Sequence, residues 1–154
     1  MKSPEPARHA DIHGGSAVPA APACAVLQLG FRPFYLLCAA FAAVSILYWL
    51  GQFMGAWPGS GYLPAALWHA HEMVFGFATA AITGFLFTAV RNWTGLPTPT
   101  GAALAAFALL WTAARITLVS GPAPLAAILD TLFLPLVAAS LFRLLRRAGN
   151  SRNY

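Results

Sequence analysis

The chain has 154 residues, of which 59% are hydrophobic and only 8% are charged, whereas roughly 25% of residues are charged in an average soluble domain. A soluble protein of this length has too little interior to hide so much apolar surface, so the composition excludes a soluble globular domain. The net charge of +5 would suggest nucleic acid as a partner in a soluble protein. Here the bases lie mostly at the ends of apolar stretches, where they set membrane orientation instead, and we expect no nucleic-acid partner.

The first 26 residues are typical of a tail. Prolines, alanines and glycines alternate there without any apolar period, so we expect residues 1–26 to form a disordered cytoplasmic tail. No apolar core of a secretory signal occurs before residue 34, since Lys2 is followed by polar and proline-rich sequence. His9 and His13 fall in this tail, and we interpret them as solvated side chains.

Residues 27–145 contain four apolar stretches, each about long enough to cross a ~30 Å hydrocarbon core as one helix. The breaks between the stretches are rich in glycine and proline, and the last break, SGPAP, is short enough to force a tight turn. The sequence therefore predicts an all-α, polytopic four-helix transmembrane bundle. Its expected spans are residues 34–53, 67–90, 101–119 and 125–145. Residues 146–154 would then form a basic cytoplasmic tail.

The positions of the bases predict how the bundle is oriented. In a four-span chain all bases except one fall on the same side of the membrane, and the loops on the other side, residues 54–66 and 120–124, carry none. The positive-inside rule then puts both termini in the cytoplasm. The beginning of the second span would lie on the outer side.

The second span begins with a cluster of ionisable residues, because His69, His71 and Glu72 fall within four positions. An ionisable group inside a span is costly and by default marks a functional site. On a regular helix His69 and Glu72 share one face and His71 points to the opposite face. An unbroken helix could not bring both histidines to one small metal ion, and the HExxH zinc pattern is absent. One histidine could still be an axial haem ligand.

Two further charges lie inside spans, Arg115 in the third and Asp130 in the fourth. They are symmetric about the 120–124 turn, each about 7–8 Å inside its end of the span at ~1.5 Å per residue. An unpaired charge at this depth would cost several kcal/mol, so we expect Arg115 and Asp130 to pair. With His69, His71 and Glu72 they would form one polar layer beneath the outer surface.

Each member of this layer also has a purely structural interpretation. His71 could reach lipid headgroups, His69 could join two helices by a hydrogen bond, and Glu72 could anchor a helix end. A pair such as Arg115 and Asp130 is more often a structural clamp than a chemical pair. The sequence assigns no catalytic residue and leaves open whether the protein is an enzyme.

Four segments of the chain match a known family in their order and spacing. They are LGFRPFYLL at 29–37, LWHAHEMVFGF at 67–77, ITGFLFTAVRNWTG at 82–95 and SRNY at 151–154. Over about residues 27–154 the chain resembles the NnrS family. Family members are longer, so the chain corresponds to their N-terminal third, and we expect it to be a fragment of a longer protein or a short form.

The resemblance implies a multi-pass protein of the bacterial inner membrane that contains haem and copper and takes part in the response to nitric oxide and nitrosative stress, in a denitrification setting. By this resemblance, the HAHE segment makes His69, His71 and Glu72 candidate functional residues. The other motifs add Arg32, Asn92 and Trp93 as motif residues. We expect His69 and His71 to bind the haem or copper. The expected partners are the lipid bilayer, nitric oxide, and further transmembrane helices or a second copy of the chain.

Two other functions stay open at this point. A small membrane transporter or proton-relay subunit would use Glu72, Arg115 and Asp130 as its pathway. A non-catalytic membrane scaffold would use the same layer only for stability.

Overall fold

A computed structural model describes residues 25–59 and 63–149, and within these ranges the chain is all-helical without any strand. Residues 1–24 of the tail expected at 1–26, and the last five residues of the chain, lie outside the described part. The elements are a 3-10 helix η1 (Ala25–Gln28), α1 (Phe31–Phe53), α2 (Ala65–His71), a π-helix η2 (Glu72–Ala78), α3 (Thr79–Thr94), α4 (Gly101–Ser120) and α5 (Ala123–Arg147).

Among the described residues, four helical segments are long and apolar enough to cross a membrane, which confirms the predicted all-α fold with four membrane-length apolar helices. The segments α2, η2 and α3 run on without a break as one 30-residue span. Helices continue past most of the expected span ends, because the hydrogen bonding of a helix does not stop where its apolar run stops. Arg146 and Arg147, expected in the terminal tail, form the last turn of α5.

The start of the described chain also differs from the sequence prediction. Ala25 and Val26 were expected in the disordered tail, but they belong to η1. The reason is a hydrogen bond from Arg32 Nη1 to the Ala25 carbonyl, 2.7 Å long, which holds η1 against the beginning of α1. The helix η1 contacts both α1 and α4.

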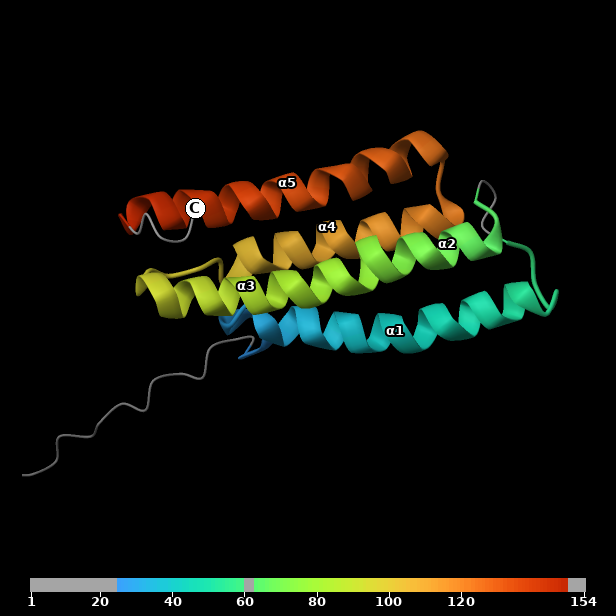
Figure 1. Ribbon diagram of the computed structural model, residues 1–154, viewed down its shortest axis with the longest axis horizontal. Helices are drawn as coiled ribbons and strands as arrows, with labels where there is room; N and C mark the ends of the chain where they lie inside the picture. The colour runs from blue at the N-terminus through green and yellow to red at the C-terminus, as the bar shows by residue number, and fades with distance from the viewer. Residues whose placement is uncertain (1–24, 60–62, 150–154) are drawn as a thin grey trace, which may run out of the picture.

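The spans alternate in direction, and α1 packs along α3, α3 along α5, and α5 along α4 (Figure 1). We call the end that holds the α4–α5 turn and the start of α2 the turn end. The opposite end is the arginine end, where α1 begins and where α3 and α5 finish. It carries five exposed arginines, which are Arg32, Arg91, Arg143, Arg146 and Arg147.

The core between these helices is apolar and centres on Phe34, Phe87, Leu104, Trp111 and Phe133. Two glycines let α1 approach the second span closely. A Cβ added to Gly84 would lie 3.0 Å from the Phe34 Cβ, and one added to Gly76 would lie 2.6 Å from the Phe41 ring. The second span therefore packs against α1 through a face that carries these small residues.

Candidate functional site

The second span changes its helical geometry where its ionisable residues occur. The π-helix η2 begins at Glu72, directly after His71, and runs for seven residues. A π-helix has i→i+5 hydrogen bonds and more residues per turn than an α-helix, and such segments are frequent at functional sites. A projection of this segment on a regular α-helix therefore misplaces its side chains.

Glu72 is the most deeply buried of the described charged residues, with 1% of its side chain exposed. Both of its carboxylate oxygens accept hydrogen bonds from Arg115 Nη1, each 3.0 Å long. Arg115 Nη2 donates to Asp130 Oδ1. The expected pairing of Arg115 with Asp130 is thus present, and Glu72 provides a second carboxylate for the same guanidinium.

His71 closes these contacts into a ring. Its Nδ1 lies 3.3 Å from Glu72 Oε1 and its Nε2 lies 3.2 Å from Asp130 Oδ2. The sequence prediction that His71 points away from Glu72 is wrong, because both side chains turn toward α4 and α5, where Arg115 and Asp130 bind them. We call His71, Glu72, Arg115 and Asp130 the ion network.

Trp111 supports the network from α4, which the sequence interpretation missed. Its indole Nε1 donates to the Gly76 carbonyl within η2, 3.1 Å away. The Arg115 guanidinium lies 5.9 Å from the centre of the Trp111 ring, within cation–π range. The spacing of Trp111 and Arg115, four positions apart on one helix, is the signal that could have revealed the contact.

His69 lies outside the ion network, so only four of the five expected layer residues come together. Its ring stacks on Trp49 of α1 with the ring centres 4.4 Å apart. Its Nδ1 is buried and has no hydrogen-bond partner. The two histidines therefore serve different faces of the second span, His69 toward α1 and His71 toward α4 and α5.

Several neighbours of His69 share its lack of partners. Buried polar atoms without a hydrogen bond occur at Trp49 Nε1, Trp68 Nε1 and both amide atoms of Gln52. Trp49 and Gln52 share a face of α1, and the rings of Tyr48 and Trp49 on this face contact Trp68 and His69 of α2. We call Trp49, Gln52, Trp68 and His69 the polar cluster. Each such atom costs about 1–3 kcal/mol if nothing satisfies it.

A haem iron and a bare metal ion need different numbers of ligands from the protein. The described residues contain no group of three or more His, Cys, Asp or Glu side chains that could hold an ion. Cys38 is no part of such a group, since its buried thiol lies 3.6 Å from the Phe77 carbonyl oxygen. An axial haem ligand needs only one imidazole, which His69 can offer. A copper ion bound by several imidazoles would need ligands beyond those described here.

The other motif residues lie at the opposite end of the bundle. Arg32 is in the first turn of α1, and Asn92 and Trp93 are exposed near the end of α3. Asn92 and Trp93 line a cleft of about 360 Å³ together with Phe31 and Tyr35. They take no part in the ion network or the polar cluster.

Four apolar spans around a buried ion network define the class of this molecule as a helical membrane protein. The sequence profile of the family described as NnrS protein matches residues 25–154. The chain belongs to the NnrS family. Comparison with curated proteins and with solved structures finds no match.

Proposed function

We propose that this protein is a component of the nitric oxide and nitrosative-stress response in a bacterial inner membrane, and that it binds haem through His69. Membership of the NnrS family supports the setting. The observation that carries the haem assignment is the polar cluster, where the His69 imidazole Nδ1 and four further buried polar atoms lack a partner. A bound group at this position would remove that cost.

His69 is a better ligand candidate than His71. Both ring nitrogens of His71 lie within 3.3 Å of a carboxylate oxygen, so ligation by His71 would break the ion network. His69 has no such contact, and its ring is held in place by stacking on Trp49. A second contact to the ring N–H that does not bind the metal normally orients a ligating histidine. Gln52 Oε1, which is buried without a partner on α1, is the acceptor that we propose for this contact.

In the proposed role, bound haem would supply an iron able to take up nitric oxide. The residues of this chain would hold the ring, exclude lipid and set the polarity beside it. Trp49 and Trp68 bring two indole N–H donors to the site. The asymmetric distribution of arginines supports an orientation with the arginine end, and hence both termini, in the cytoplasm.

The test is the optical spectrum and metal content of detergent-purified protein from cells supplied with a haem precursor and copper. The wild type should show a Soret band that shifts when nitric oxide is added without oxygen. His69→Ala should lose the band. His71→Gln, which keeps hydrogen-bonding capacity within the ion network, should retain it. A wild-type preparation free of haem, iron and copper, or a band that survives His69→Ala, would overturn the proposal.

A proton-relay or transport role has less support. The side chains that would continue a path below Glu72 are threonines, and the hydroxyls of two of them bond to their own helix. Thr79 Oγ1 donates to the Phe75 carbonyl, and Thr88 Oγ1 donates to the Gly84 carbonyl 3.1 Å away. The ion network is also closed on itself, as in a structural clamp. Proteoliposome transport that Glu72→Gln abolishes would favour the transport role.

A further inference from the structure

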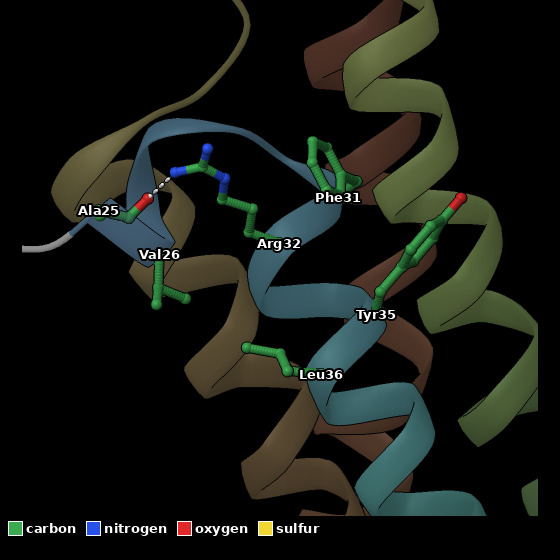
Figure 2. A pocket seen from close by; sticks show the side chains of 6 residues that line it. All are labelled: Ala25, Val26, Phe31, Arg32, Tyr35 and Leu36. Carbon is green, nitrogen blue, oxygen red and sulfur yellow. Dashed lines mark hydrogen bonds between the residues drawn. The ribbon is translucent and has the colours of Figure 1, made fainter.

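A pocket of about 390 Å³ lies beside the first turns of α1, at the arginine end of the bundle. Its walls are Ala25, Val26, Phe31, Tyr35 and Leu36, and Arg32 is its charged member. Figure 2 shows the Arg32 guanidinium beside the Ala25 carbonyl, with Leu36 further along α1. We call this the Arg32 pocket.

The pocket combines one cation with an exposed apolar floor. Val26, Tyr35 and Leu36 are 39%, 45% and 62% exposed, so the floor is open to the surroundings of the bundle. Leu36 is one helical turn beyond Arg32, or about 6 Å deeper along the span. A molecule that fits must therefore place a polar group at the membrane surface and an apolar chain below it.

The charge around the pocket selects an anionic polar group. Glu72 and Asp130 are the only acids in the described part of the chain, and both are in the ion network at the turn end. The arginine end carries five exposed arginines and no described acid that could neutralise them. Arg32 uses Nη1 for the Ala25 carbonyl. Its guanidinium has further N–H donors in a planar fork that suits phosphate.

We propose that the Arg32 pocket binds one anionic phospholipid, with the phosphate on the Arg32 guanidinium and the beginning of an acyl chain along Val26, Tyr35 and Leu36. Basic pockets next to transmembrane helices are known sites for anionic lipid headgroups. An acidic soluble protein would match the charge, but it would leave the apolar floor uncovered. The lipid would also brace η1 against α1, because its phosphate contacts the side chain that holds Ala25.

Native mass spectrometry of the full chain in detergent, with phosphatidylglycerol or phosphatidylcholine of the same acyl chains added, tests this site. Wild-type protein should retain phosphatidylglycerol about fivefold more strongly, the preference that ~1 kcal/mol per arginine gives. Arg32→Gln should abolish the preference. Arg147→Gln removes the same charge from the same end but lies outside the pocket lining, and it should keep most of the preference.

A second variant tests the apolar part of the pocket while Arg32 stays in place. Leu36→Trp fills the apolar part of the pocket, one helical turn below Arg32, and should weaken phosphatidylglycerol retention, whereas Leu109→Trp, on the exposed face of α4, should not. Equal retention of the two lipids by the wild type would overturn the proposal. Equal losses in Arg32→Gln and Arg147→Gln would also overturn it, because they would indicate a diffuse charge effect and no single site.

Discussion

The charged residues at the two ends of the bundle differ in burial and in pairing. At the turn end, Glu72 and Arg115 are buried, with 1% and 6% of their side chains exposed, and they share a closed network with His71 and Asp130. At the arginine end five arginines are exposed, and no described carboxylate lies near them. Both ends belong to the same helices (Figure 1).

The difference follows from where each charge lies along its span. Arg115 and Glu72 are inside apolar helices, where an uncompensated charge loses its hydration and is stable only with a well-placed partner. The arginines of the other end are in terminal turns, from which long side chains can reach headgroups and water. The charges inside the bundle thus depend on closely placed partners. The arginines at the arginine end need no such partner and contribute their positive charge to the membrane surface.

The largest expected effect is that of Arg115→Leu, which leaves two carboxylates buried without their cation. Breaking a buried pair in this way costs about 3–5 kcal/mol of unfolding free energy. Arg147→Leu at the arginine end removes an equal charge from an exposed position and should change stability by less than about 0.5 kcal/mol. Unfolding of both variants in the same detergent measures the contrast, and equal losses would contradict the assigned difference between the ends.

Within the network, Glu72→Gln should be more harmful than Asp130→Asn. Glu72 is almost fully buried and accepts two bonds from Arg115, so loss of its charge should cost about 2–3 kcal/mol. Asp130 is 15% exposed, and water can replace part of its contact. The same unfolding measurement ranks the two variants. A larger loss for Asp130→Asn would mean that Asp130, and not Glu72, is the main partner of the guanidinium.

Much of the fold could be predicted from the sequence, because apolar length and glycine–proline breaks decide where a chain crosses a membrane. The Arg115–Asp130 contact was also predictable, since the short 120–124 turn fixes the register of α4 against α5. Both of these features depend on local sequence or on a short connection.

The arrangement of the histidines was not predictable in this way. The projection on a regular helix places His71 away from Glu72. In addition, nothing in the residues EMVFGFA indicates that η2 is a π-helix. The contact of Trp111 with Gly76 joins residues 35 positions apart, so it depends on how α4 packs against the second span. The roles of His69 and His71 as metal ligands stay predictions.

Gly76→Ala tests whether the close approach of α1 to η2 is needed below the network. The added Cβ would lie 2.6 Å from the Phe41 ring and 2.8 Å from Glu72 Oε2. Phe41 cannot move freely, since its ring packs edge-on against Trp111 with centres 5.3 Å apart. We expect a loss of about 2 kcal/mol from overpacking. Gly59→Ala, which meets nothing within 4 Å, is the matched control.

A smaller loss is expected for Gly84→Ala, nearer the arginine end, where the closest atom to the added Cβ is 3.0 Å away. Phe41→Leu combined with Gly76→Ala should recover part of the stability, because a narrower side chain leaves room for the methyl group. If Gly76→Ala were as harmless as Gly59→Ala, the tight packing beneath the ion network would not be a constraint on this fold.

The smallest effect tests the link between Trp111 and the π-helix. Trp111→Phe keeps an aromatic ring under the Arg115 guanidinium but removes the indole N–H that donates to the Gly76 carbonyl. A neutral hydrogen bond contributes about 1 kcal/mol, so the unfolding free energy should fall by about that amount. Trp111→Leu also removes the cation–π contact and should cost more. Trp93→Phe, an exposed tryptophan at the arginine end, should cost nearly nothing. Equal effects of Trp111→Phe and Trp93→Phe would show that the π-helix does not depend on the indole for its position next to α4.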